Sequence, residues 1–153
     1  MRAPMRAVVQ RVNQATVSVE DQIVGHVELG VCVLVGVGRD DTVADAVALA
    51  DKVVGLRIFE DDAQKMNLSV LEVGGALLAV SQFTLFGDVR KGKRPSFSQA
   101  LEPTAAEALF EQFCSECRTR GARVETGRFR KHMQVALEND GPVTILIDTK
   151  RAF

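Results

Sequence analysis

This chain of 153 residues contains neither tryptophan nor tyrosine. Its hydrophobic core therefore has to be built from aliphatic side chains and eight phenylalanines. Its apolar runs fall short of the roughly 18–20 residues that cross a bilayer, which argues against a membrane-spanning helix. The beginning of the chain also lacks the apolar region of a signal peptide, so we expect a cytoplasmic protein with no membrane partner.

Cysteine is scarce as well, and the three that are present point away from disulfides and metals. An odd number of thiols argues against a disulfide framework and suits a reducing compartment. Cys114 and Cys117 are spaced as a zinc-binding or redox pair, but no second pair of cysteines or histidines completes a four-ligand site. Because both fall within a helical pattern, we expect buried thiols, and neither a metal ion nor another cofactor.

The signatures of common hydrolases and nucleotide-binding folds are also missing. The two histidines, His26 and His132, are both expected to be exposed to solvent. There is no Gly-x-Ser-x-Gly motif, so a serine–histidine–aspartate site would need distant residues to converge. Gly36 and Gly38 stand between a strand pattern and a helix pattern. However, Asp41 replaces the third glycine of a dinucleotide fingerprint and would repel a pyrophosphate.

The net charge of −1 at pH 7 gives no overall sign of nucleic-acid binding. The positive charges are nevertheless clustered, first at 90–94 and again at 118–131. Such clusters on an otherwise neutral surface can hold a few phosphates. A solvated loop and helix end would explain the same pattern, so a nucleic-acid-binding module without catalysis is one alternative that stays open.

Hydrophobic periodicity predicts a single α/β domain over residues 1–153. Alternating or continuous apolar runs predict strands, which fall at 15–19, 23–27, 29–37, 76–83, 122–126, 132–138 and 143–149. Apolar residues three and four apart predict two main helices, beginning near 40–42 and at 102–104. Strands outnumber helices without strict alternation, so we expect a mixed, largely antiparallel, barrel-like sheet.

Two short segments join small polar residues to apolar strands. Residues 81–88 read Ser-Gln-Phe-Thr-Leu-Phe-Gly-Asp, and residues 139–144 read Asn-Asp-Gly-Pro-Val-Thr. Glycine allows backbone angles closed to other residues and proline donates no N–H, so carbonyls at the Gly-Pro step can face outward and accept hydrogen bonds from a ligand. An ordinary turn with a trans peptide bond is the simpler interpretation of the spacing alone.

Together the two segments resemble the paired signatures Ser-Gln-x-x-Leu and Asn-x-Gly-Pro-x-Thr of the D-aminoacyl-tRNA deacylases, or D-tyrosyl-tRNA deacylases. Further segments resemble the same family in order along the chain, at 5–12, 65–69, 91–97, 125–129 and 133–135. Residues 1–4 precede this similarity and are interpreted as a short N-terminal extension. The resemblance implies hydrolysis of the ester between a D-amino acid, or glycine, and the terminal adenosine of tRNA, a chiral proofreading step in translation.

The resemblance also implies roles for individual residues. The catalytic side of the site would be formed by Ser81, Gln82, Phe83 and Thr84. Substrate binding and chiral selection would involve Gly141, Pro142, Met133, Phe129 and Arg11. Contacts to tRNA would involve Lys91, Lys93 and Arg94. The family resemblance further implies a homodimer, in which a cis Gly-Pro turn enters the partner's site and its carbonyls bind the α-ammonium of the substrate.

Arg11 is unusual within the strand pattern, because alternation places it on the apolar face of Ala7 and Val9. A buried charge needs acceptors, which either an ion pair or the backbone of the Gly-Pro turn would supply. The sequence leaves both interpretations open.

The chain departs from the family pattern after Phe129. Many relatives have a Gly-Ala step before the methionine, whereas this chain has Arg130, Lys131 and His132. The departure affects the expected rim of the pocket and its contact with the tRNA end. A serine or threonine esterase, with Ser81 or Thr84 as nucleophile, is a second alternative.

Overall fold

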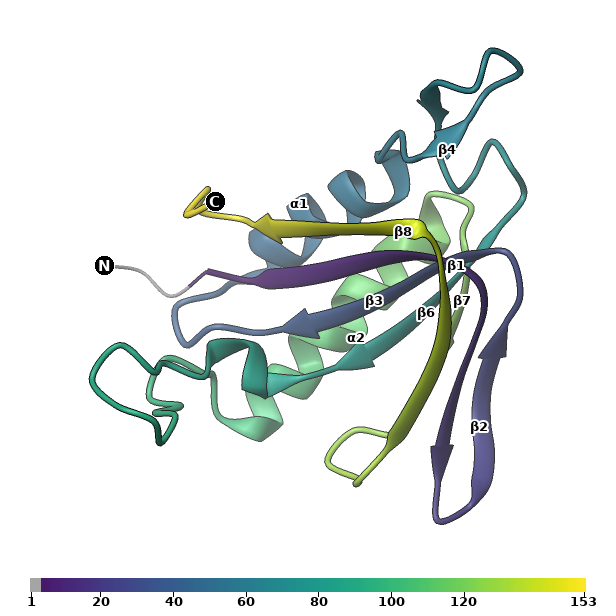
Figure 1. Cartoon of the computed structure of the whole chain (residues 1–153). Coiled ribbons are helices and arrows are strands. Elements are labelled where there is room, and N and C mark those ends of the chain that lie inside the picture. Colours follow the sequence, from purple (N-terminus) through teal and green to yellow (C-terminus); the bar gives the residue numbers. More distant parts are fainter. Residues whose placement is uncertain (1–3) are drawn as a thin grey trace.

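The computed structural model describes residues 4–153 (Figure 1). The elements along the chain are β1 (Arg6–Val19), β2 (Gln22–Val27), β3 (Gly30–Gly36), α1 (Val43–Gly55), β4 (Phe59–Glu60), β5 (Met66–Leu68), β6 (Ala76–Ser81), the 3-10 helix η1 (Phe83–Phe86), α2 (Pro103–Thr119), β7 (Arg123–Thr126) and β8 (Gln134–Asp148). Apart from Pro4, the predicted extension at 1–4 lies outside the described residues.

Six strands form one mixed sheet in the order β2-β1-β3-β6-β7, with β8 paired to β1. β1 is antiparallel to β2, β3 and β8, whereas β3–β6 and β6–β7 are parallel. Figure 1 shows β1 and β8 bending together, so that part of each strand curls away with β2. The curl brings β2 close to β7: a Cβ on Gly25 would lie 2.8 Å from the carbonyl oxygen of Thr126. The sequence predicts one α/β domain with a mixed, largely antiparallel, barrel-like sheet and two main helices. The single α/β domain, the mixed and nearly closed sheet and the two helices are confirmed.

The core lies on both faces of this sheet. On one face the two helices cover the strands, and Leu49 of α1, Phe113 of α2 and Leu77 of β6 are fully buried there. On the other face, Leu78 of β6 packs inside the curl with Val17 of β1. Because β6 is covered on both sides, its sequence is continuously apolar.

Local signals explain where α2 begins and what it buries. The Glu102 side chain caps the helix by accepting hydrogen bonds from the backbone N–H groups of Thr104 (3.0 Å) and Ala105 (2.7 Å). Cys114 and Cys117 are free, buried thiols, and burial raises the pKa of each to about 12. The prediction of buried thiols is therefore confirmed. No helix within residues 4–153 is long and apolar enough to span a membrane.

Predicted strand boundaries are wrong in three places, two of them next to the motifs. The strand expected at 15–19 is the end of β1, which begins at Arg6 because its pairing with β3 and β8 extends that far. The strand expected at 76–83 ends at Ser81, because η1 begins at Phe83. The strands expected at 132–138 and 143–149 are one strand, β8. Asn139 pairs with Val12 and Thr144 pairs with Gln10, so residues 140–143 bulge opposite Arg11. The Gly-Pro step is thus a bulge within a strand and not a turn between two strands, because β1 continues to pair on both sides of it.

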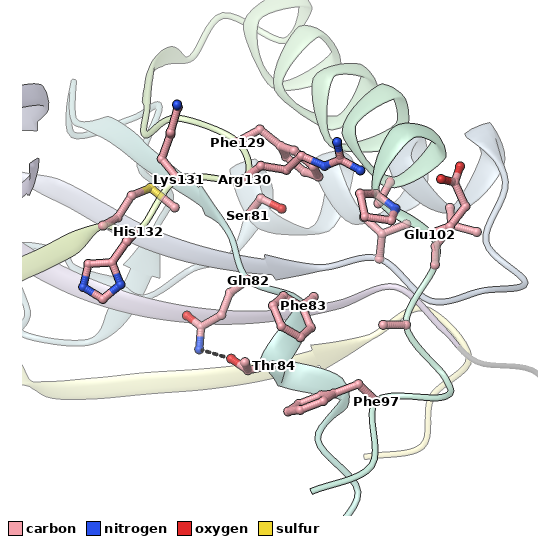
Figure 2. Close-up of a pocket in the computed structure, with 16 residues that line it drawn as sticks. Ser81, Gln82, Phe83, Thr84, Phe97, Glu102, Phe129, Arg130, Lys131 and His132 are labelled. Carbon is pink, nitrogen blue, oxygen red and sulfur yellow. Dashed lines mark hydrogen bonds between the residues drawn. The ribbon is translucent and has the colours of Figure 1, made fainter. Parts of the chain in front are cut away.

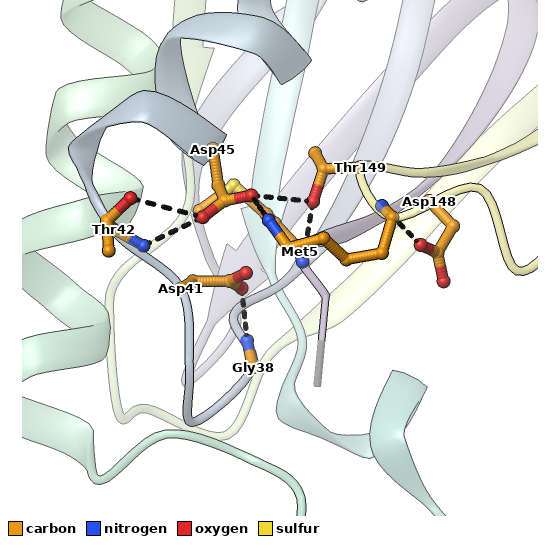
Figure 3. Close-up of polar contacts among 8 residues, drawn as sticks. Met5, Gly38, Asp41, Thr42, Asp45, Asp148 and Thr149 are labelled. Atoms are coloured by element: carbon orange, nitrogen blue, oxygen red, sulfur yellow. Dashed lines mark hydrogen bonds and ion pairs between the residues drawn. The ribbon is translucent and has the colours of Figure 1, made fainter. Parts of the chain in front are cut away.

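Both ends of the described chain are tied to the start of α1 (Figure 3). The backbone N–H of Met5 donates to the Thr149 hydroxyl (3.1 Å), which donates to the Asp45 carboxylate (3.0 Å). Lys150 also binds this carboxylate. Although burial alone raises the pKa of Asp45, the hydrogen bonds from Lys150, Thr42 and Thr149 outweigh it, and the pKa lies below its usual value.

The pKa of Asp41, next to this cluster, is shifted in the opposite direction from that of Asp45. One of its carboxylate oxygens accepts a hydrogen bond from the N–H of Gly38 (2.6 Å). The other oxygen is buried and has no hydrogen-bond partner among the described residues. Burial raises the pKa of Asp41 to about 7.

Candidate active site

A cavity of about 770 Å³ opens where β6 ends and η1 begins (Figure 2). Its walls come from the end of β6, η1, the loop before α2, the start of α2, and the connection between β7 and β8. The predicted site residues that it brings together are Ser81, Gln82, Phe83, Thr84, Phe129 and Met133. This group contains all four residues implied in catalysis.

The chain passes from β6 into the short 3-10 helix η1 within two residues. The N–H of Gln82 makes the last bond to β3, donating to the Val35 carbonyl (2.7 Å). The chain then tightens into η1, where the N–H of Leu85 donates to the Gln82 carbonyl (3.3 Å). The N–H groups of Phe83 and Thr84 stand at the start of this short helix and therefore have no acceptor within it.

Among the described residues, the side-chain hydrogen bond formed by residues 81–84 joins two of these neighbouring site residues and does not involve a general base. The Gln82 amide donates to the Thr84 hydroxyl (3.1 Å). Within residues 4–153, neither histidine ring forms a hydrogen bond with Ser81 or Thr84. His26 is paired with the hydroxyl of Thr16 (3.0 Å), and His132 is exposed at the cavity rim. The expected exposure of both histidines is confirmed, and among the described residues no histidine or carboxylate is hydrogen-bonded to the hydroxyl of Ser81 or Thr84, as a serine or threonine nucleophile would need.

Gly141 and Pro142 lie elsewhere on the chain, in the β8 bulge, and do not line the cavity of the same chain. The peptide bond between them is cis, as predicted, and both residues are exposed. Gly141 has φ +131°, and a Cβ on it would lie 2.8 Å from Cγ2 of Val143 and 3.1 Å from Nη2 of Arg11. This position therefore requires glycine.

Arg11 fixes the bulge from beneath. It is buried, and its guanidinium donates to the carbonyls of Ile58 (2.8 Å) and Asp140 (3.1 Å). The Asp140 carboxylate lies 3.4 Å away and that of Glu60 lies 3.9 Å away. The ion-pair interpretation of Arg11 is thus confirmed, and its guanidinium also braces the bulge through the carbonyl of Asp140, the residue before Gly141.

The outer residues of the Asn-x-Gly-Pro-x-Thr motif hold the bulge from the side. The Asn139 side chain accepts a hydrogen bond from the N–H of Val143 (2.7 Å) and donates to the Thr144 hydroxyl (3.2 Å). These bonds explain why an amide and a hydroxyl stand at this spacing. Hydrogen bonds within the motif therefore hold Gly141 and Pro142 at the surface.

Lys91, Lys93 and Arg94 form an exposed basic loop between η1 and α2, and they do not line the cavity. The loop is closed by the backbone of Asp88 and Ser96, which exchange two hydrogen bonds (2.8 and 2.9 Å).

Sequence analysis missed Phe97, which follows the basic loop and lines the cavity. Its ring meets that of Phe83 edge to face, with centroids 5.0 Å apart. An aromatic residue at the end of a basic segment is the signal that could have identified it. It extends the apolar wall of the cavity toward the loop.

Comparison with known proteins finds a family and close relatives for this chain. The sequence model of the D-Tyr-tRNA(Tyr) deacylase family matches residues 8–148. A D-aminoacyl-tRNA deacylase of Anaeromyxobacter dehalogenans is 62% identical, and one of Koribacter versatilis is 60% identical. Each match spans 149 residues, covering 97% of this chain and 100% of the relative.

Solved structures share the fold. A c-Myc DNA unwinding element binding protein superposes with a TM-score of 0.88 at 38% identity, covering 93% of this chain and 97% of that one. A probable eukaryotic D-amino acid tRNA deacylase superposes with a TM-score of 0.79 at 22% identity, covering 95% of this chain and 99% of that one. From the family match and the nearly full-length relatives, we conclude that this chain belongs to the D-Tyr-tRNA(Tyr) deacylase family.

Proposed function

We propose that this protein hydrolyses the ester bond between a D-amino acid, or glycine, and the terminal adenosine of tRNA. The observation that carries the proposal is the meeting of residues 81–84 with Phe129 and Met133 around one cavity. Relatives that match over nearly the whole chain are named D-aminoacyl-tRNA deacylases. The protein would thus act in chiral proofreading, in the cytoplasm where translation takes place.

The chemistry would rest mainly on the backbone. The N–H groups of Phe83 and Thr84 would polarise the ester carbonyl and stabilise the negative charge that develops on its oxygen. Because neither Ser81 nor Thr84 is hydrogen-bonded to a histidine or carboxylate within residues 4–153, we assign activation of water to the substrate's own ribose 2′-hydroxyl, which is adjacent to the ester. Ser81 and Gln82 would line the adenosine side of the cavity, and the Gln82–Thr84 hydrogen bond would keep η1 in place.

Chiral selection would need a second copy of the chain. Among the strands of residues 4–153, β8 pairs with β1 alone, and it exposes the apolar side chains of Val135 and Leu146, which are 36% and 56% exposed. An unpaired strand edge with exposed apolar residues is suited to association with another chain. In the proposed homodimer, the carbonyls of Gly141 and Pro142 enter the partner's cavity and bind the substrate's α-ammonium. With the α-ammonium fixed in this way, the side chain of the substrate has only one direction open to it. The side chain of an L-amino acid would collide with the bulge, whereas glycine, which has no side chain, would be tolerated.

Mixing two inactive variants tests this shared site. Gly141→Ala disrupts the bulge, and Ala100→Trp fills the cavity. If each site combines one cavity with the partner's bulge, half of the dimers in an equal mixture are hybrids with one intact site. About a quarter of wild-type activity should then return. Recovery below a few per cent, with hybrid formation verified by native mass spectrometry, would contradict the shared site.

Nucleic-acid binding without hydrolysis is the second candidate. It is favoured by the exposed basic loop and by the similarity to the DNA unwinding element binding protein. Incubation with excess D-aminoacyl-tRNA separates the candidates. Release of amino acid over many turnovers supports the deacylase, whereas retention of intact aminoacyl-tRNA in a stable complex supports the binding module. A covalent aminoacyl-enzyme would instead favour the serine or threonine esterase.

A further inference from the structure

The connection between β7 and β8 places uncompensated positive charge at the mouth of the cavity. Arg130 and Lys131 line the cavity and are exposed, and we refer to them as the cationic rim. Neither residue takes part in any ion pair formed within residues 4–153. The acidic residue of the cavity lining, Glu102, is already engaged in capping α2. The rim can therefore attract an anion from outside.

The backbone of the rim is held in an uncommon conformation. Arg130 has φ +65°, a left-handed conformation that glycine adopts freely and few other residues adopt. The turn is closed by the N–H of Lys131, which donates to the Arg128 carbonyl (3.3 Å). Met133 packs tightly against the start of the turn. Its sulfur lies so close to Gly127 that a Cβ on this glycine would be only 2.5 Å from it. An arginine kept at such a position, where glycine fits better, points to a use for its side chain.

The rim faces the aromatic wall across the cavity. Figure 2 shows Arg130 and Lys131 on one side of the cavity, and Phe83 and Phe97 on the other. An aminoacyl-adenosine in the cavity would have its ester beside η1. Its 5′ oxygen would continue into the phosphodiester backbone, which has to leave through the mouth. The first anionic groups outside the cavity would then pass beside the rim.

We propose that Arg130 and Lys131 bind the phosphodiester groups immediately preceding the terminal adenosine. An arginine fork can bind one phosphate through two hydrogen bonds, and a lysine supplies a mobile point charge for the next. The basic loop lies outside the cavity lining, beyond Phe97, so it meets nucleotides farther along the RNA. This inference rests on the proposed function and adds a contact that positions the 3′ end of the substrate.

Steady-state kinetics with two substrates test the inference. The variant Arg130→Gly/Lys131→Ala removes both charges and gives the turn the residue that its φ favours. For D-aminoacyl-tRNA, KM should rise about tenfold at moderate salt with kcat within twofold, because the lost contacts position RNA and do not touch the ester. For D-aminoacyl-adenosine, which has no phosphate, both constants should stay unchanged. Equal changes with both substrates would mean that the variant altered the cavity, and would overturn the proposal.

Binding measurements keep the inference testable even if no hydrolysis occurs. The dissociation constant of a short single-stranded RNA ending in CCA is measured by fluorescence anisotropy across a salt series. Each phosphate contact contributes about 0.7 to the slope of log K against log salt, so the variant should lose about 1.4. Lys52→Ala/Arg57→Ala is the matched control, since it removes two exposed positive charges that lie outside the cavity lining and outside both basic clusters, and it should leave the slope unchanged. An unchanged slope in the rim variant, or an equal loss in the control, would overturn the proposal, whereas failure of wild type to release D-amino acid would refute the proposed function alone.

Discussion

Replacing Arg11 tests how much of the stability depends on the support beneath the β8 bulge. Arg11 is 7% exposed, and its guanidinium donates to two backbone carbonyls, those of Ile58 and Asp140. A hydrogen bond to a charged group contributes about 1.5–3 kcal/mol, so Arg11→Met should lower the free energy of unfolding by about 3–5 kcal/mol. The ion pairs with Glu60 and Asp140 add little, because those carboxylates are half exposed. Arg11→Lys keeps the charge but can reach only one carbonyl, and should lose about half as much.

Urea denaturation followed by far-UV circular dichroism measures this loss, because the chain has no tryptophan or tyrosine for a fluorescence assay. With a slope of about 2 kcal/mol per molar urea, the midpoint for Arg11→Met should fall by roughly 1.5–2.5 M. Arg123→Met is the control, since it removes an exposed arginine on β7 and should change the free energy by less than about 0.5 kcal/mol. A loss below about 1 kcal/mol for Arg11→Met would refute the bracing role.

Three further predictions concern the chemistry, the RNA and the pH dependence. Ser81→Ala and Thr84→Ala should each keep kcat within about tenfold of wild type, because neither hydroxyl has a base to activate it; a loss of a thousandfold or more would instead support a side-chain nucleophile. Changing the three cations of the basic loop to alanine should raise KM for charged tRNA and flatten its salt dependence, with kcat nearly constant; an unchanged salt slope would place the RNA elsewhere. Burial raises the pKa of Asp41 from 3.8 to about 7, so the folded protein holds this proton more tightly than the unfolded chain. The free energy of unfolding should therefore fall by up to about 4 kcal/mol as pH rises from 4 to 7, and Asp41→Asn should remove this slope in urea titrations at several pH values; a slope that persists would assign the effect to other groups.

Elements with a local signal could be predicted from the sequence. The apolar run of β6 and the capped, amphipathic α2 depend on neighbours in sequence, and both were found to within a few residues. The continuity of β8 could not be predicted, because it depends on pairing with β1 on both sides of the bulge. A Gly-Pro pair ordinarily ends a strand, and only the partner strand reveals that this one continues.

The motifs of the candidate site could be identified in the sequence, but their arrangement in space could not. Ser81 and Phe129 are far apart in sequence and meet because β6 and β7 run parallel and side by side, so that the chain leaves both at the same edge of the sheet. Strand order of this kind is not encoded in local periodicity, and the family resemblance supplied the grouping. The left-handed conformation of Arg130 could not be predicted either, because arginine rarely adopts a positive φ.

The central claim is chiral discrimination in the hydrolysis of aminoacyl-tRNA. The most direct test compares kcat/KM for the same tRNA charged with the D- and the L-form of one amino acid, with glycyl-tRNA as the achiral reference. We expect release of the D-amino acid to exceed that of the L-amino acid by at least about a hundredfold, the ratio that a difference of about 2.7 kcal/mol in transition-state binding produces. Glycine should be released at an intermediate rate. Equal cleavage of the two enantiomers, or no release of the D-amino acid, would contradict the account.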